Sequence, residues 1–510
     1  MYITKSLYKE FSNFPKLARW HINNKVVYQA INEYEYGSID GATIGQEVED
    51  VVKQLFESKN IAEVKLEDFK NFHQNYAKAT DKVMALSPDV IYQGGFLIDD
   101  LFVKTDFLIK NDDGKYDLVE VKSINTPLTD TKIPKLKQDL TDDMSFQRYV
   151  LQKTFSKFSG KVYLYHLNKD YVKHGKIVPS EIIKTMKVTE YLDDDETIEH
   201  NIELMRNNLN LTEENFNQTY PFDGGDYFVY YGKEPEKGTI FSIPRITQSK
   251  KKLKTLLDNG KLYVKDLDEN DIQQLGNGDE ESTLQKFVKL YLQGEVVDKE
   301  GIKDLFSTLK FPLFFYDYET MSGAIPIFDG TSPRQQATVQ YSMHIMDVNG
   351  KIEHFANIVD FKAPNNKSVI DAFIKDCGVA NGTFIAWNKG FECGRNTESG
   401  EMYPEYKEIF ERINANTFDL MEVFKKLLYF HKDFNGSASI KKVLPVLTDI
   451  SYDNLEVGNG GIATALLKNI VLGNMSKEEY EKAKKDLLTY CEQDTRAMVE
   501  IYRKVLEKIK

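Results

Sequence analysis

The feature that most constrains this chain is a pair of strand-like runs joined by a tight turn, VKTDFLIK-NDDGK-YDLVEVKS at residues 103–123. Both runs are rich in β-branched and aromatic residues, which favour strands. If Asp112-Asp113-Gly114 forms a three-residue loop with Gly114 in the left-handed region, Asn111 pairs with Lys115. The spacing therefore predicts a β-hairpin with a defined register.

That register places Asp106 opposite Glu120, and Lys122 shares the face of Glu120 because it lies two residues further on. Two facing carboxylates raise each other's pKa unless a cation lies between them. Carboxylate oxygens suit Mg²⁺, and a nearby lysine can activate water or neutralise a phosphate. The alternative is a surface hairpin with a Glu–Lys ion pair. The segment Glu63-Val64-Lys65 has the same E-x-K spacing.

A second acidic group begins with the apolar run PLFFYDYETM at residues 312–321, which predicts a strand. Asp317 and Glu319 share one face of that strand. Downstream, TFIAWNKGFE predicts a strand and then a turn, with Asn388 and Glu392 four residues apart. These carboxylates follow apolar runs, where solvated acids are unusual.

The chain closes with a predicted long helix, whose start is marked by the capping-box pair Ser476 and Glu479. Asp494 falls between Leu487 and Met498 on the apolar stripe of this helix, and Tyr490 is on the same stripe. An ionised carboxylate facing a core is costly without a partner or a metal ion. The alternative is a buried, hydrogen-bonded structural carboxylate.

Composition and patterning divide the 510 residues into three segments, at 1–175, 176–305 and 306–510. The middle segment is polar and charge-clustered, whereas strand and helix patterns alternate in the last one, as in an α/β fold. Between Arg245 and Lys265, seven basic residues stand against one acid. A solvated helix face and a nucleic-acid contact both fit this basic run.

Charge and cysteine content argue against several classes of protein. With 66 Lys and Arg against 79 Asp and Glu, the net charge is −13, which disfavours a protein that coats nucleic acid with its whole surface. Three dispersed cysteines form neither a disulfide framework nor a four-thiolate site, so we expect a reducing, cytoplasmic location. The start of the chain shows no secretory signal, and no run reaches the roughly 18 apolar residues of a membrane span. The histidines, His344 among them, show no ligand spacing.

The first acidic group resembles the RecB-like branch of the PD-(D/E)xK nucleases. That resemblance implies a metal site with an acidic helix residue, an Asp, an E-x-K pair and a helix Gln. The matching residues are Glu49 or, as the alternative, Glu47, together with Asp106, Glu120, Lys122 and Gln147. Gly45 stands where relatives often have a histidine, and this region contains no cysteine, so the resemblance implies a version without an iron–sulfur cluster.

The second acidic group resembles the tyrosine-type DEDD 3′–5′ exonucleases, because D-x-E, N-x3-E and Y-x3-D occur in that order. The resemblance implies that four carboxylates bind two Mg²⁺ or Mn²⁺ ions and that a tyrosine orients the attacking water. The implied ligands are Asp317, Glu319, Glu392 and Asp494, with Tyr490 as the tyrosine. The usual third carboxylate is Asp, so Asp419 in NTFDLMEVF stays open as an alternative to Glu392.

The order of the two groups resembles an uncharacterised bacterial family that joins these two domains. It implies a restriction-endonuclease-like core at 1–175, a helical or irregular connector at 176–305 and an RNase H-like DEDD fold at 306–510. We expect a metal-dependent nuclease with two active sites, the first holding one or two Mg²⁺ or Mn²⁺ ions. DNA is the favoured substrate and partner, RNA is also open, and no membrane partner is expected. The alternatives are a nucleic-acid-binding scaffold with inactive sites and a phosphoesterase acting on nucleotides.

Overall fold

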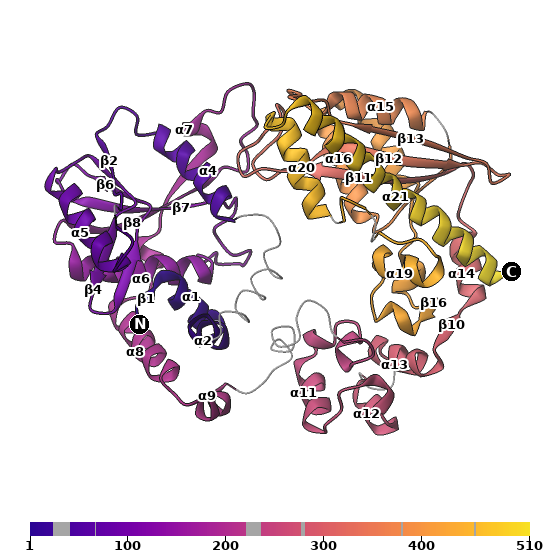
Figure 1. Ribbon diagram of the computed structural model, residues 1–510, viewed down its shortest axis with the longest axis horizontal. Helices are drawn as coiled ribbons and strands as arrows, with labels where there is room; N and C mark the ends of the chain where they lie inside the picture. The colour runs from indigo at the N-terminus through magenta and orange to yellow at the C-terminus, as the bar shows by residue number, and fades with distance from the viewer. Residues whose placement is uncertain are drawn as a thin grey trace. The chain divides into compact units, whose positions relative to one another are not determined.

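The computed structural model describes residues 1–23, 41–66, 68–220, 236–276, 281–378, 381–452, 455–458 and 460–510. These residues fall into two compact units (Figure 1). Unit 1 takes in the described residues up to 220 together with Gly323–Gln335, and unit 2 takes in the remainder. Both units combine sheets with helices, which confirms a mixed α/β architecture.

Unit 1 alternates short strands with helices. Its strands are β1 Ile3–Thr4, β2 Ile61–Glu63, β3 Val90–Tyr92, β4 Gly95–Ile98, β5 Leu101–Lys104, β6 Phe107–Lys110, β7 Tyr116–Lys122, β8 Phe158–Leu167 and β9 Ile183–Lys187. Its helices are α1 Lys5–Asn13, α2 Pro15–Asn23, α4 Gly41–Gln54, α5 Phe72–Ala85, α6 Gln138–Thr154, α7 Pro179–Ile182, α8 Asp195–Leu209 and α9 Glu213–Thr219.

The main sheet of unit 1 has six strands in the order β2-β3-β6-β7-β8-β9. Alternate residues of a strand face opposite sides of a sheet, and β7 follows this rule. Leu118 belongs to the core shared with α1 and α6, whereas Val119 and Val121 belong to the core shared with α4. The sheet is therefore covered by helices on both faces, which explains why its central strands are almost continuously apolar.

The predicted hairpin is confirmed with its register. Gly114 has a φ of 74°, and the Asn111 N–H donates to the Lys115 carbonyl at 2.7 Å. Phe107 pairs with Val119. The loop chemistry thus brings the position before β6, where Asp106 lies, next to the end of β7.

Unit 2 is built around a second sheet. Its strands are β10 Glu295–Val297, β11 Leu313–Met321, β12 Ala337–Met346, β13 Ile352–Ile358, β14 Thr383–Ala386, β15 Thr417–Asp419 and β16 Tyr429–His431. Its helices are α11 Lys250–Asp258, α12 Glu269–Gln274, α13 Thr283–Gln293, α14 Lys299–Phe306, α15 Lys367–Cys377, α16 Gly390–Met402, α17 Lys407–Ala415, α18 Glu422–Lys425, α19 Ile440–Leu447, α20 Gly460–Leu472 and α21 Lys477–Ile509. The segment predicted as a connector, 176–305, contributes elements to both units.

The five-stranded sheet of unit 2 has the order β13-β12-β11-β14-β15, with β12 antiparallel and β14 parallel to β11. Phe315 of β11 contacts Tyr502 of α21, whereas Tyr316 and Tyr318 contact Phe373 of α15. Odd-numbered residues of β11 therefore face α21, the long helix that runs along the sheet in Figure 1. Asp317 and Glu319 share this face.

Helix α21 begins where its capping signal predicts. The Ser476 side chain accepts from the Glu479 N–H, and the Glu479 side chain accepts from the Ser476 N–H. The predicted apolar stripe is buried along the helix, at Leu487, Cys491 and Met498 among others. Across the described residues, no helix combines the length and the apolar character that crossing a membrane requires.

Two candidate active sites

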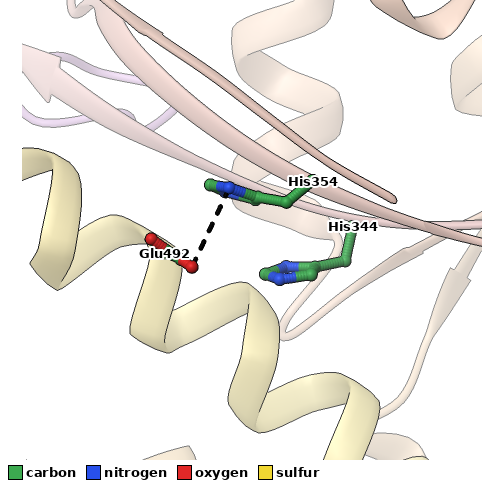
Figure 2. A group of neighbouring side chains, drawn as sticks. All are labelled: His344, His354 and Glu492. Carbon is green, nitrogen blue, oxygen red and sulfur yellow. Dashed lines mark ion pairs between the residues drawn. The ribbon is translucent and has the colours of Figure 1, made fainter. Parts of the chain in front are cut away.

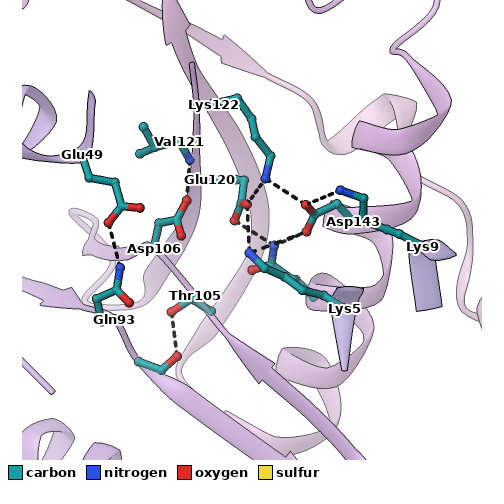
Figure 3. A network of polar contacts seen from close by, with 12 residues as sticks. Lys5, Lys9, Glu49, Gln93, Thr105, Asp106, Glu120, Val121, Lys122 and Asp143 are labelled. Carbon is teal, nitrogen blue, oxygen red and sulfur yellow. Dashed lines mark hydrogen bonds and ion pairs between the residues drawn. The ribbon is translucent and has the colours of Figure 1, made fainter. Parts of the chain in front are cut away.

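The first candidate site lies at the end of the β6–β7 hairpin in unit 1. The Val121 N–H donates a 2.8 Å hydrogen bond to the Asp106 carboxylate, which fixes this side chain beside β7. Glu120 is buried, and the Lys122 ammonium lies 2.5 Å from its carboxylate. The three residues of the predicted triplet are thus brought together, as Figure 3 shows.

Helix α6 adds an acid and an amide to this site. Gln147, a predicted site residue, donates through its Nε2 to Glu120 and to Asp143, each at 2.8 Å. Asp143 lies one helical turn before Gln147 and accepts a hydrogen bond of 2.9 Å from Lys122. Asp143 is a residue that the sequence analysis missed.

Helix α1 adds two further lysines that the sequence analysis also missed. The Lys5 ammonium lies 3.0 Å from the Glu120 carboxylate, and the Lys9 ammonium lies 3.4 Å from Asp143. Lys5 and Lys9 are four residues apart, so they project from one face of α1. Their partners are more than 100 positions away in the chain, and the only local signal was this i, i+4 spacing.

The charges of this network set the protonation states of its carboxylates. Burial alone would raise the pKa of Glu120, but the ammonium groups of Lys122 and Lys5 outweigh it and hold that pKa below its ordinary value. Asp106 has no ion pair with any of the described residues. Burial and the neighbouring Glu120 charge raise the pKa of Asp106 to about 7.

Helix α4 places Glu49 on the other side of Asp106 (Figure 3). The Glu49 carboxylate accepts hydrogen bonds from Tyr92 at 2.7 Å and from Gln93 at 2.8 Å. Its charge contributes to the raised pKa of Asp106. Glu47 is two residues away on the same helix, on a different face. The geometry therefore favours Glu49 over Glu47 as the helix carboxylate of the site.

The second E-x-K segment has the environment of a surface ion pair. The side chains of Glu63 and Lys65 are 44% and 77% exposed and lie 3.4 Å apart. The Glu120 side chain, in contrast, is 1% exposed. Burial therefore distinguishes the two E-x-K segments, which have the same spacing in the sequence.

The oxygen atoms around Asp106 form a donor set that suits a hard divalent cation. Asp106, Glu120 and Glu49 offer carboxylate oxygens, the ligand type that Mg²⁺ and Mn²⁺ prefer. The lysines pair with Glu120, whereas the pKa of Asp106 stays raised. A cation at this position would therefore remove a repulsion that the lysines leave in place.

The second candidate site is a cluster of carboxylates in unit 2. Asp317 and Glu319 come from β11, Glu392 from the first turn of α16 and Asp494 from α21. Glu392 is buried, whereas the other three are half-buried. The other three predicted acids thus lie near Asp317, since the charge of each raises the pKa of Asp317.

Burial raises the pKa of every carboxylate in this acidic cluster, and neighbouring acids of the cluster add to the rise at Asp317 and Glu319. The pKa of Asp317 lies well above its ordinary range because desolvation and the nearby charges of Asp494 and Glu392 disfavour its ionised form. Burial, together with Asp494, raises the pKa of Glu319 to about 8. Burial raises the pKa of Glu392 to about 8 and that of Asp494 to about 6. Without a cation, these acids therefore cannot all ionise near neutral pH.

The structure favours Glu392 over Asp419 as the third carboxylate. Asp419 ends β15, and one of its oxygens accepts hydrogen bonds from the N–H groups of Asn388 and Met421, at 3.0 and 3.1 Å. That oxygen holds the turn between β14 and α16. The Glu392 Oε2 atom, by contrast, is buried and has no hydrogen-bond donor among the described residues. An unpartnered buried oxygen is the more suitable metal ligand.

Two tyrosines and a lysine border the acidic cluster. The predicted Tyr490 is buried, and its hydroxyl accepts a 3.3 Å hydrogen bond from the Lys441 ammonium. Tyr452, which the sequence analysis missed, donates a 2.6 Å hydrogen bond to Asp494. Burial and the nearby Asp494 charge raise the pKa of both tyrosines, so both hydroxyls stay protonated.

The donor set of the cluster fits a hard divalent ion. The Cys491 sulfur lies 3.9 Å from an Asp317 carboxylate oxygen. Burial and the charges of Asp317 and Glu319 raise the pKa of the Cys491 thiol. A protonated thiol is a poor ligand, so the available donors are carboxylate oxygens, which suit Mg²⁺ or Mn²⁺.

A cavity of 910 Å³ lies in unit 2 next to the start of α19. Arg245, Lys252 and Lys425 line it together with aromatic side chains such as Phe424. Ser439 also lines it, and the next residues along the chain lead to Lys441, which contacts Tyr490. Part of the basic run thus faces a cavity, whereas Lys254 pairs with Asp258 on an exposed helix surface.

Comparisons with other proteins place this sequence among relatives whose function is open. Residues 314–439 match the model of a family described as "Domain of unknown function (DUF2779)". "Uncharacterized protein MG366" of Mycoplasma genitalium is 31% identical over 228 residues, which cover 41% of this chain and 34% of that protein. "Uncharacterized protein UU173" of Ureaplasma parvum is 29% identical over 242 residues, which cover 42% of this chain and 34% of that protein. The chain spans about a third of the length of these curated relatives.

Among solved structures, the one titled "Crystal structure of SSO0001" aligns with a TM-score of 0.22 and 13% sequence identity. The alignment covers 40% of this chain and 74% of that chain.

Proposed function

We propose that this chain is a metal-dependent nuclease with two separate catalytic centres, one in each unit. The first centre would cleave phosphodiester bonds through Asp106, Glu120 and Lys122. The second would remove nucleotides from 3′ ends through its four carboxylates. DNA is the favoured substrate, as the likeness of the first site to RecB-like nucleases implies.

One observation carries the proposal: Asp317, Glu319, Glu392 and Asp494 gather from three elements with raised pKa values. Like charges this close are costly in a buried site unless a cation neutralises them. A purely structural cluster would be expected to have basic or donor partners for each acid. The buried Oε2 atom of Glu392 has no hydrogen-bond partner among the described residues.

In the second centre, the chain's own groups would position the reactants. Mg²⁺ or Mn²⁺ held by the four carboxylates would neutralise the scissile phosphate and stabilise the entering and leaving oxygens. The Tyr490 hydroxyl accepts from Lys441, which leaves its hydrogen free to orient a water. Tyr452 holds the Asp494 carboxylate at a defined angle. Fixed geometry of this kind is what proximity catalysis requires.

In the first centre, Lys122 would stabilise the charge that develops on the phosphate. Asp143 and Glu120 hold its ammonium in place. Gln147 fixes the orientation of Glu120 through its amide. Asp106, whose raised pKa comes from burial and from Glu120, would bind the metal ion with Glu49 beside it.

The test uses end-labelled single- and double-stranded DNA and RNA, incubated with the full chain and Mn²⁺. We expect Asp317→Asn to abolish stepwise shortening from 3′ ends and Glu120→Gln to abolish the other cleavage products. Each variant should leave the activity of the other centre within about twofold, because the two sets of residues belong to different units.

Two matched controls separate specific effects from general ones. Glu63→Gln alters the exposed E-x-K segment, and Asp360→Asn alters an exposed acid of unit 2. Both should behave as the wild type. A Glu120→Gln, Asp317→Asn double variant that digests all four substrates at the wild-type rate would refute the proposal. Mn²⁺-dependent cleavage of mononucleotide esters in place of oligonucleotides would indicate a phosphoesterase.

A further inference from the structure

Two histidines of unit 2 lie opposite each other on neighbouring strands, outside the acidic cluster. His344 of β12 and His354 of β13 are register partners, and their ring centroids are 4.5 Å apart. Glu492 of α21 reaches the same place, with a carboxylate oxygen 3.9 Å from His354 Nδ1 (Figure 2). One ligand atom from each of the three residues lies within 4.8 Å of the other two.

Two hydroxyl groups behind the rings determine which nitrogen of each imidazole carries the proton. Thr495 donates its single hydroxyl hydrogen to the Glu492 carbonyl at 3.1 Å, so its oxygen can only accept from its other neighbours. Those neighbours are His344 Nδ1 and the Ser342 hydroxyl, both at 2.8 Å. Ser342 therefore donates to Thr495 and accepts from His354 Nε2 at 2.9 Å.

This chain of hydrogen bonds leaves a free lone pair on His344 Nε2 and another on His354 Nδ1. A neutral imidazole whose other nitrogen donates to a fixed acceptor is the form that binds metal ions in proteins. The hydroxyl partners thus hold both rings in the tautomers that a metal site needs. This is an observation independent of the clustering of the three residues.

We propose that His344, His354 and Glu492 bind a transition-metal ion of the zinc type, with water completing the coordination. Two imidazole nitrogens and one carboxylate are an established ligand set for Zn²⁺. Ligand atoms that lie about 2.0–2.1 Å from a tetrahedral ion are about 3.4 Å from one another. The three ligand atoms observed here lie within 4.8 Å of one another, so small side-chain rotations would bring them to the distances of a tetrahedral site. His344 is buried, whereas the His354 and Glu492 side chains are 28% and 48% exposed, which leaves a side open for water.

This site differs from the acidic cluster in its ligands and in its position. Glu492 and Asp494 are two residues apart on α21, about 200° around the helix. The cluster offers oxygen donors, which suit Mg²⁺ or Mn²⁺, whereas the histidine site offers nitrogen donors, which suit Zn²⁺. An ion at the histidine site would join β12 and β13 to the helix that carries Tyr490 and Asp494. We expect it to stabilise that arrangement.

The test measures Zn²⁺ binding by calorimetry and Co²⁺ binding by visible absorption on the chelator-treated full chain. Among the Zn²⁺ ions that the chain binds, we expect one whose affinity falls at least tenfold in His354→Ala and in Glu492→Gln. These two positions are partly exposed, so both variants should fold, in contrast to a change at the buried His344. The Co²⁺ complex should show the visible bands of a low-symmetry nitrogen-ligated ion, and His354→Ala should remove them.

Two controls decide the assignment. His200→Ala removes an exposed histidine of unit 1, and Asp317→Asn alters the acidic cluster. Both should retain the Zn²⁺ equivalent. The proposal is overturned if His354→Ala binds Zn²⁺ like the wild type, if no Zn²⁺ equivalent is found, or if Asp317→Asn is the variant that loses it.

Discussion

The Tyr452 hydroxyl donates a 2.6 Å hydrogen bond to Asp494, whereas Tyr490, one turn before Asp494 on α21, donates no such bond to it among the described residues. The ring centroids of the two tyrosines are 6.5 Å apart, and the Lys441 ammonium lies 5.3 Å from each ring centroid. Two tyrosines beside one acidic cluster therefore have different partners. We expect them to have different roles.

Replacing each tyrosine by phenylalanine should separate these roles. Burial raises the pKa of Asp494 to about 6, and the Tyr452 hydrogen bond opposes that rise. Tyr452→Phe should raise this pKa further and weaken Mn²⁺ binding at pH 7 several-fold. Tyr490→Phe should leave Mn²⁺ binding within about twofold and lower kcat about 100-fold, as loss of one positioned donor does. Calorimetry and single-turnover kinetics measure both effects, and equal losses of Mn²⁺ affinity in the two variants would contradict the assignment.

The raised pKa values predict how stability depends on pH in the absence of metal. The pKa of Glu319 is about 8 in the folded chain because of burial and Asp494, against an ordinary value of 4.5. The folded state therefore binds more protons than the unfolded state between these values, so stability falls as the pH rises from about 4 to about 8. Mn²⁺ should restore the loss, and its stabilising effect should grow with pH.

A Glu319→Gln variant isolates this effect in thermal unfolding. It should raise the metal-free stability at pH 8 by about 1–2 kcal/mol, which is less than the full shift would give at about 1.4 kcal/mol per pKa unit, because solvent screens the half-buried Glu319. At pH 5 it should change little, because the native carboxyl is then already protonated. If Glu319→Gln were less stable than the wild type at pH 8, the claim that the Glu319 charge is uncompensated in the metal-free folded chain would be contradicted. Asp360→Asn provides the comparison for the loss of an exposed acid.

Turn and cap chemistry made part of this architecture predictable. The loop ending in Gly114 sets the register that brings Asp106 beside Glu120, and Ser476 with Glu479 marks the start of α21. These signals are local, because a few adjacent residues determine the backbone. The sequence also indicated the carboxylates of both sites, through acids that follow apolar strands.

The remaining site residues could not be predicted because tertiary packing alone brings them in. Lys5 and Glu120 are 115 positions apart, and Tyr452 precedes Asp494 by 42. The pairing of His344 with His354, in contrast, follows from a local turn and could have been predicted from the sequence. The Asp347 N–H donates to the Lys351 carbonyl, and Gly350 has a φ of 81°, so the turn itself pairs His344 with His354.

Asp143 should be the main electrostatic support of the first site. It accepts from Lys122 and lies within 4 Å of the Lys5 and Lys9 ammonium groups, while its own side chain is 2% exposed. Asp143→Ala should lower the free energy of unfolding by about 3–5 kcal/mol, because it leaves partly buried cations without their acid. Urea unfolding measures this. Asp139→Ala, at an exposed position of the same helix, should cost at most about 1 kcal/mol; a cost that small for Asp143→Ala would refute the prediction.

On the proposed function, we expect a nucleic-acid strand to contact unit 2 at the basic cavity. Arg245→Glu should weaken the binding of single-stranded DNA. It should also reduce the slope of the logarithm of the binding constant against the logarithm of the salt concentration, by about 1 or more per lost phosphate contact. Lys251→Glu changes the same basic run but does not line the cavity. Fluorescence anisotropy at several salt concentrations compares the two. If Lys251→Glu weakens binding as much as Arg245→Glu, the run acts as a general charged surface and the cavity has no special role.

The most direct test counts the Mn²⁺ ions that the acidic cluster binds. Electron paramagnetic resonance on the chelator-treated full chain measures this number. The account predicts that an Asp317→Asn, Asp494→Asn double variant binds two fewer ions than the wild type and stays folded. Equal numbers of bound ions with equal affinities in the two proteins would contradict it.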